Sequence, residues 1–365
     1  VISSHFKTAT ELYDAVHELY YNLPYDISLI SLKDAGRSSI NYPKISTITI
    51  PYYEYGAYMC RELIRSIENP EAELPSGSFS HDIVLDDLYT VGIPYNSHMK
   101  KIIVVGSINL DNYLNVEELP YSGKTVKSFI SSSYAGGKAL NTAVGISKLG
   151  HQVSVIGNVG NDSESDIIFS ALNAYHINPS AVKRCQGQKT GQAHIFVQPD
   201  GESMITIMSG ANNALTVSDV VRNQSLFDNA SFCILQTEVP TDCLIEAAGI
   251  SRARGIRTVL KPATSGALPE ELIKNIDILI PNQNELADIC PGKGSMEEQA
   301  KSLLLMGAGT VIVTLGDQGC YMVSADSEKY YPAQDFDAID ASGACDAFIS
   351  SLVSYLIYGY DMDKA

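Results

Sequence analysis

The chain has 365 residues, a formal net charge of −17 and 45% hydrophobic residues. That length allows two domains, and the hydrophobic content supports a sizeable buried core. The net negative charge, without a run of basic residues, argues against a surface that binds nucleic acid or an anionic membrane. The seven cysteines are scattered without a C-x-x-C pair, and no apolar run approaches the roughly 18 residues that a membrane span needs. With no signal peptide visible, we expect a cytoplasmic protein with reduced thiols.

The first part of the chain, over residues 1–98, has a mixed pattern of short elements. Hydrophobic periodicity predicts helices over 8–20 and 53–67 and strands over 27–32, 46–50 and 83–85. A stretch over 91–99 that contains Gly92 and Pro94 predicts a linker to the second part.

The second part, over residues 99–365, alternates short apolar runs with helical segments. Strands are expected over 102–105, 153–156, 232–235, 258–260, 276–280 and 311–314, and helices over 140–149, 163–175, 242–254 and 296–306. This alternation predicts an α/β fold with a mostly parallel sheet and helices on both faces. Three further runs, at 126–134, 191–197 and 203–208, predict a small antiparallel β lid over the strand ends, where such sheets bind ligands.

The most informative motif is Asp340-Ala341-Ser342-Gly343-Ala344-Cys345-Asp346, which an apolar helical run follows at once. Small residues let the backbone turn tightly into a helix, whose first N–H groups are unpaired and can bind an anion. A carboxylate there, Asp346, can take a proton from a substrate hydroxyl while the N–H groups stabilise a transferring phosphoryl group. The motif therefore predicts kinase chemistry, and an ordinary helix cap is the alternative.

Two polar stretches near the predicted lid suggest a small-molecule site. Asn109 and Asp111 follow the first strand of the second part and suit hydrogen bonds to vicinal hydroxyls, although a polar turn would need the same residues. The run Gly136-Gly137-Lys138 opens a helix that also carries Asn141. Glycines permit a close approach of the backbone, so this run indicates a polyol or phosphate site, or else a glycine-rich turn with a solvated lysine.

Two other strand ends suit a nucleotide. Asn282 and Glu285 follow the strand at 276–280, where they can hold Mg²⁺ through water or cap a helix. Thr314 and Gly316 end the strand at 311–314 in a polar loop that suits nucleotide contact.

In this order, the segments from about Lys101 onward resemble the ribokinase-like carbohydrate kinases, the PfkB family. The resemblance implies ATP-dependent phosphorylation of a pentose, D-ribose at O5, with Mg²⁺ required and K⁺ activating. It also implies a possible homodimer through the lid strands. Another sugar or a nucleoside remains open as the substrate. A sugar-sensing regulator with a weakly active or inactive kinase domain remains open as the alternative to an enzyme.

The resemblance assigns roles residue by residue. It implies that Asp346 is the general base and that the backbone at Gly343, Ala344 and Cys345 forms the anion hole. Sugar contacts are implied for Asn109, Asp111, Gly137, Lys138, Asn141 and Glu238. Nucleotide contacts are implied for Asn282, Thr314 and Gly316, a water-mediated Mg²⁺ contact for Glu285, and a K⁺ site for Asp340 and Ser342.

Three features depart from that family's pattern. Cys345 stands where a glycine is usual, so the anion hole requires backbone dihedral angles that accept a side chain. Lys261 stands near the phosphate region where an asparagine is usual. The family's pattern continues beyond Ala365, so we expect the segments that complete the adenine pocket and the K⁺ site to lie outside this sequence.

Residues 1–34 and 43–88 resemble a different family, the C-terminal part of the sugar-binding domain of LacI-type repressors. The resemblance implies an α/β fragment of periplasmic-binding-protein type. Those repressors usually carry two adjacent acids where this chain has Lys33-Asp34, which weakens the expectation of effector binding. The expected organisation is a partial repressor-type domain over 1–98 and a kinase domain over 99–365. Such a repressor–kinase fusion would contact DNA only through a region outside these residues.

Overall fold

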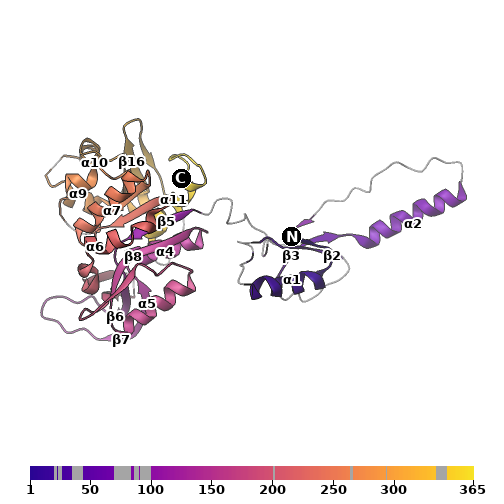
Figure 1. Ribbon diagram of the computed structural model, residues 1–365, viewed down its shortest axis with the longest axis horizontal. Helices are drawn as coiled ribbons and strands as arrows, with labels where there is room; N and C mark the ends of the chain where they lie inside the picture. The colour runs from indigo at the N-terminus through magenta and orange to yellow at the C-terminus, as the bar shows by residue number, and fades with distance from the viewer. Residues whose placement is uncertain are drawn as a thin grey trace. The chain divides into compact units, whose positions relative to one another are not determined.

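The computed structural model describes residues 1–19, 23, 27–34, 44–69, 84–85, 90, 100–199, 202–263, 266–292, 294–333 and 343–365. The chain divides into two compact units, Val1–Met99 and Lys100–Ala365 (Figure 1). The predicted linker over 91–99 and the predicted K⁺ ligands Asp340 and Ser342 lie outside the described residues.

The first unit is a four-stranded sheet with the order β1-β2-β3-β4. The first three strands run parallel, and β4 pairs antiparallel with β3. A small core forms around Ala9, Leu29 and Ile45, and no residue of the second helix is buried. The elements are β1 (Ile2–Ser3), α1 (Phe6–Glu18), β2 (Ile30–Asp34), β3 (Ser46–Ile50), α2 (Tyr52–Glu68) and β4 (Val84–Leu85). The sequence patterns do not predict β1, and the other elements lie close to their expected bounds.

The second unit is built on a nine-stranded sheet with the order β17-β16-β15-β14-β13-β12-β5-β8-β9. All neighbours from β15 to β9 are parallel, and β16 and β17 add an antiparallel edge. The strands are β5 (Lys101–Val105), β8 (Gln152–Gly160), β9 (Val182–Cys185), β12 (Ala230–Gln236), β13 (Arg257–Lys261), β14 (Ile278–Leu279), β15 (Thr310–Thr314), β16 (Cys320–Ser324) and β17 (Glu328–Tyr331).

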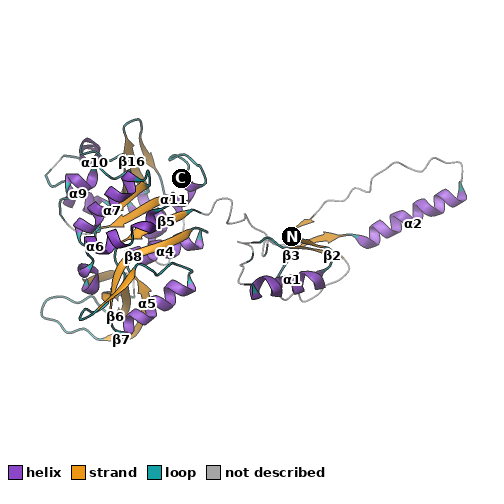
Figure 2. Ribbon diagram, viewed as in Figure 1, coloured by secondary structure: helices purple, strands orange, loops and turns teal. Residues whose placement is uncertain are grey.

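Helices cover both faces of this sheet, which confirms the predicted α/β architecture (Figure 2). One face packs against α4 (Lys138–Lys148), α5 (Ser163–Ala174) and α11 (Ala344–Ile357). The other face packs against α6 (Val217–Arg222), α7 (Thr241–Ala253), α8 (Glu270–Ile273), α9 (Gln283–Ile289) and α10 (Met296–Leu305). Short 3₁₀ helices complete the unit: η1 (Gly210–Ala214), η2 (Gln224–Phe227) and η3 (Gly316–Gln318).

The continuous apolar runs of the sequence follow from this two-sided burial. In β5, Ile103 and Val105 belong to the core on the α7 side, whereas Ile102 and Val104 belong to the core on the α4 side. Successive side chains of a strand point to opposite faces, so a strand buried on both faces must be apolar throughout.

A separate four-stranded sheet, the lid sheet, has the order β11-β10-β6-β7. Its strands are β6 (Asn109–Val116), β7 (Ser128–Gly136), β10 (Gly191–Val197) and β11 (Ser203–Met208). The prediction of an antiparallel lid is wrong in one respect, because β6 belongs to the sheet and runs parallel to β10. Asn109 and Asp111 thus lie in a strand and not in a turn. The sequence hid this strand because Asn and Asp are depleted in strands.

Truncation of a central strand residue tests the packing of the second unit. Ile234 of β12 is fully buried, so Ile234→Ala should lower the free energy of unfolding by about 2–5 kcal/mol through lost contacts and a cavity. The control Leu305→Ala, at a residue that is 90% exposed, should change it by less than about 0.5 kcal/mol. Urea unfolding followed by circular dichroism measures both, and equal effects would contradict the assigned core.

Candidate active site

A cavity of about 630 Å³ lies between the lid sheet and the N-terminus of α11. Alternate residues of the lid strands line one wall, which means that a single face of the lid sheet forms that wall. Those residues are Asn109, Asp111, Tyr113, Asn115, Ser132, Tyr134, Ala193, Ile195, Ile205 and Ile207. The remaining lining includes Gly137, Lys138, Asn141, Glu238, Gly343 and Asp346. All of the predicted sugar contacts therefore share one cavity with the predicted base.

The start of α11 forms the end of this cavity. Gly343 is the N-cap residue, with a left-handed backbone at φ 75°, and the helix begins at Ala344. The first N–H groups of a helix have no partner within the helix, so those of Ala344 and Cys345 are placed to bind an anion. Among the described residues other than glycine, only His176 and Asn229 have positive φ, so Cys345 has a backbone that accepts a side chain. The cysteine at this position therefore leaves the N–H geometry intact.

Asp346 is a buried carboxylate, 8% exposed, with a specific hydrogen-bond donor. Thr142 Oγ1 of α4 donates to Asp346 Oδ1 at 3.1 Å, and Gln236 Nε2 of β12 donates to Thr142 Oγ1 at 3.0 Å. Burial raises the pKa of Asp346 to about 6, although Lys138 and the Thr142 hydrogen bond oppose the shift. At neutral pH the group is ionised, yet it is a stronger base than an exposed aspartate. Sequence reasoning missed Thr142 and Gln236 because only the fold brings them to Asp346.

A second carboxyl group with a raised pKa, that of Asp111, lies on the lid side of the cavity. Burial raises its pKa to about 6, against a hydrogen bond from the backbone of Gly137, and the charge of Glu238 raises it further. Glu238 Oε1 lies 3.8 Å from the Lys138 ammonium, and its Oε2 accepts a hydrogen bond from Ser107 Oγ. Several acids around one ammonium favour a neutral ligand with many hydroxyl donors over an acidic one.

Gly137 sets how closely the lid approaches α4. Its φ is 90°, and a Cβ added there would lie 2.7 Å from the Asn109 backbone N and 2.8 Å from the Ser107 carbonyl O. Asn109 is itself fixed, because Asn212 Nδ2 of η1 donates to its Oδ1 at 2.7 Å. Asn212 Oδ1 in turn accepts the Ile108 N–H at 2.9 Å. No sequence pattern pointed to Asn212, because its role depends on a contact between distant parts of the chain.

The predicted nucleotide residues gather at the carboxyl ends of β14 and β15. Asn282 caps α9 in a reciprocal capping box: its Oδ1 accepts the Glu285 N–H at 2.8 Å, and Glu285 Oε2 accepts the Asn282 N–H at 2.7 Å. Asn282 and Thr314 form an isolated parallel β-bridge. Thr314 is the last residue of β15, and Gly316 begins η3 two residues later. Asn282 and Glu285 thus do cap a helix, as one of the two interpretations of these residues expected. Glu285 Oε2 further contacts the ammonium of Lys261.

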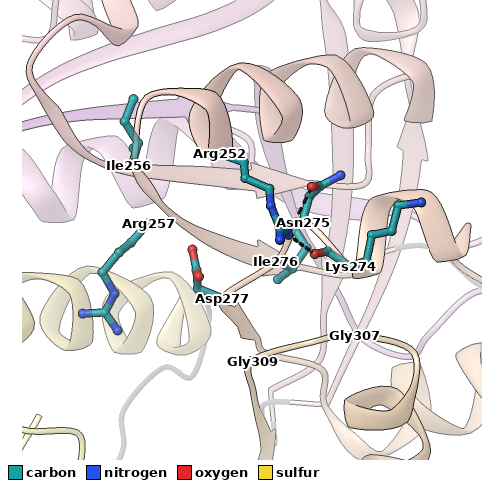
Figure 3. Close-up of a pocket in the computed structure, with 10 residues that line it drawn as sticks. Arg252, Ile256, Arg257, Lys274, Asn275, Ile276, Asp277, Gly307 and Gly309 are labelled. Carbon is teal, nitrogen blue, oxygen red and sulfur yellow. Dashed lines mark hydrogen bonds between the residues drawn. The ribbon is translucent and has the colours of Figure 1, made fainter.

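A smaller hollow of about 270 Å³ lies at the opposite edge of the sheet (Figure 3). Arg257 and Asp277 stand at the amino ends of β13 and β14, and Arg252 Nη1 donates to the Lys274 carbonyl and to Asn275 Oδ1. Open α/β sheets bind ligands at the carboxyl ends of their strands, so this hollow is not the candidate active site.

The described part of the chain lacks the features of two other kinds of site. No group of three or more His, Cys, Asp and Glu side chains there is arranged to hold a metal ion. Within the same described ranges, every helix is too short or too polar to cross a membrane.

Comparisons with known proteins agree with this fold. Residues 99–365 match the pfkB family carbohydrate kinases. Ribokinase of Staphylococcus aureus is 35% identical over 262 residues, which cover 70% of this chain and 86% of that protein. The bifunctional ribokinase/ribose-5-phosphate isomerase A of Fructilactobacillus sanfranciscensis is 36% identical over 263 residues, covering 71% of this chain and 49% of that protein. The structure of Arabidopsis thaliana ribokinase complexed with ribose and ATP aligns with a TM-score of 0.66 at 27% identity, covering 73% of this chain and 88% of that one.

The fold and the site thus define an α/β phosphotransferase with an alcohol group as acceptor. The chain belongs to the pfkB family of carbohydrate kinases.

The close approach at Gly137 leads to a prediction with a matched control. Gly137→Ala should lower kcat/KM for the sugar by roughly 100-fold, because the added methyl group displaces β6 from α4 and misplaces the ligand contacts. Gly123→Ala introduces the same kind of strain at φ 83°, but no heavy atom lies within 4 Å of the new Cβ. Steady-state kinetics of both variants measure the difference, and a similar loss in both would refute the steric explanation.

Proposed function

We propose that the protein transfers the γ-phosphoryl group of ATP to O5 of D-ribose. The observation that carries the proposal is the single cavity that joins Asp346 and the start of α11 to the polar side chains of Asn109, Asp111 and Lys138. The substrates are supported by the relatives, since one is a ribokinase and another is a ribokinase complexed with ribose and ATP.

Sugar recognition would use both polar and apolar parts of the cavity. Asp111 and Glu238 accept hydrogen bonds from hydroxyl groups, and Lys138 and Asn141 donate them. Ile195 and its apolar neighbours on the lid sheet would pack against the carbon atoms of the ring. Another sugar or a nucleoside remains the alternative substrate, because the lid side chains set the choice among related alcohols.

In the proposed reaction, Asp346 Oδ takes the proton of the O5 hydroxyl as that oxygen attacks the γ-phosphorus. The bond from phosphorus to the bridging oxygen breaks, and ADP leaves with the electron pair. The N–H groups of Ala344 and Cys345 stabilise charge on the equatorial oxygens. Most of the rate enhancement would come from positioning, since the in-line arrangement leaves the protein little covalent chemistry.

Asn282, Thr314 and Gly316 are proposed to contact the nucleotide. Mg²⁺ would enter with ATP and neutralise charge on its phosphates. Glu285 Oε2 already accepts a backbone N–H and contacts an ammonium. The contact of this carboxylate with Mg²⁺ is proposed to run through a bound water, as the resemblance implies. Activation by K⁺ at Asp340 and Ser342 stays a prediction from the resemblance, because both residues lie outside the described ranges.

A sugar-sensing regulator without useful turnover is the second candidate function. The first unit, which resembles the sugar-binding domain of a repressor, favours it. The buried Asp346 beside an intact helix N-terminus favours the enzyme, since a carboxylate with a pKa near 6 is suited to a base and costly to retain otherwise.

For residues 1–98 we propose the repressor-type domain, supported by parallel strands with accompanying helices. A fusion that contacts DNA through a further region, a homodimer through the lid sheet and a cytoplasmic location belong to the same set of proposals. The sequence of the complete reading frame and the solution mass of the protein test the first two.

The role of Asp346 is tested by removal of its charge. Asp346→Asn should lower kcat by about 1,000-fold or more while the Kd for ribose changes by less than about threefold, because the base is lost but the cavity keeps its shape. ADP release in the presence of ATP, Mg²⁺ and K⁺ measures turnover, and calorimetry measures binding. Asp326→Asn, at an exposed turn, is the matched control and should match the unmodified protein. Turnover retained in Asp346→Asn would remove the assigned role.

A further inference from the structure

Lys261 carries a buried ammonium to which the proposed reaction assigns no role. It is the last residue of β13, at the ligand-binding edge of the sheet, and is 3% exposed. Its Nζ contacts Oε2 of Glu285, the residue at the start of α9. Burying two charges carries a large desolvation cost before their attraction is counted. A protein that only needed to hold β13 against α9 would do so as well with an apolar pair.

The position of Lys261 relative to the reacting groups gives this ammonium a use. Glu285 and Asn282 belong to the predicted nucleotide side, whereas Asp346 and Cys345 belong to the acceptor side. Lys261 also adjoins the acceptor side, because it is the register partner of Gln236 across β12 and β13. Gln236 donates to the Thr142 hydroxyl, which in turn donates to Asp346. Lys261 thus stands at a strand end between the Glu285 side and the Asp346 side, where the transferring phosphoryl group is expected to pass.

We propose that Lys261 is a catalytic residue whose ammonium contacts the phosphoryl group during transfer, and that Glu285 is the positioning residue that aims it. This inference rests on the proposed kinase function. In phosphoryl transfer, negative charge is spread over the equatorial oxygens of the moving group. An ammonium supplies a compact positive charge with three donors, which suits those oxygens whatever their rotation. Lys138 approaches the same centre from the lid side, so the phosphoryl group would pass between two ammonium groups and the start of α11.

The competing explanation is that Lys261 and Glu285 form a purely structural ion pair. The two explanations differ for a variant in which both charges are removed. If the pair is structural, Lys261→Met combined with Glu285→Gln leaves no unpaired charge in the interior, so the double variant should be no more impaired than Glu285→Gln alone, whose proposed Mg²⁺ contact it also lacks. A catalytic Lys261 cannot be replaced in that way, and the double variant should stay as impaired as Lys261→Met alone.

The experiment compares the purified protein with Lys261→Met, Lys261→Arg, Glu285→Gln and the double variant in ribose phosphorylation. We expect kcat to fall about 100- to 1,000-fold in Lys261→Met and equally in the double variant, with KM for ribose within about threefold of the unmodified protein. Lys261→Arg should recover part of the loss. Lys274→Met is the matched control, since this exposed lysine lies at the opposite edge of the sheet (Figure 3). Recovery of kcat in the double variant, or no loss in Lys261→Met, would overturn the inference.

A binding measurement separates catalysis from misfolding. The affinity for ADP with ribose should be similar in Lys261→Met and in the unmodified protein, whereas the gain in affinity on addition of aluminium fluoride, which mimics the phosphoryl group in transit, should be lost in Lys261→Met. An unchanged gain would contradict a contact with that group. If the unmodified protein turns over no sugar, the proposed function fails and this inference fails with it. If it turns over ribose and Lys261→Met does so equally well, only this inference fails.

Discussion

The burial of one carboxyl group, Asp346, is the constraint on which the rest of the site depends. A buried carboxylate is stable only where donors and positive charges offset its lost hydration. The packing of α4 against α11 supplies the donor: Ser350 Oγ of α11 donates to the Thr142 carbonyl, and Thr142 Oγ1 donates to Asp346. Gly145 of α4 lies against Ser350, so close that an added Cβ would meet Ser350 Oγ at 2.5 Å. The helix contact that forms the core also holds the base.

Two ammonium groups act on Asp346, one from the proposed sugar side of the site and one from the proposed nucleotide side. Lys138 stands on the lid side, next to Glu238 and the predicted sugar contacts. Lys261 stands on the nucleotide side, next to Glu285. The two ammonium groups keep the pKa of Asp346 from rising further, so the group remains ionised at neutral pH. In the proposed reaction, the charges that offset the burial of Asp346 would also bind the group that is transferred.

Sequence patterns alone predicted the strands that are buried on both faces, because such strands must be apolar throughout. The strands at 102–105 and 232–235 are continuous apolar runs, and α11 begins within the small-residue motif, at Ala344, two residues before Asp346. Sequence patterns failed for β6, because its polar side chains conceal a strand. The same side chains, from which a small-molecule site is predicted, line the cavity. Contacts such as Thr142 with Asp346, or Lys261 with Glu285, join segments far apart in the chain. No local pattern encodes them, so they appear only in the folded structure.

The central claim is that burial makes Asp346 a base with a pKa of about 6, and the pH dependence of kcat/KM for ribose tests it most directly. The reaction requires the ionised carboxylate, and a raised pKa moves the loss of that form from the acid range toward neutral pH. We therefore expect a plateau above about pH 7 and a fall of at least tenfold per pH unit well below pH 6, made steeper by Asp111 if that group must also be ionised. A profile that stays flat down to about pH 4.5 would contradict the claim, because it would indicate a base with the pKa of an exposed aspartate.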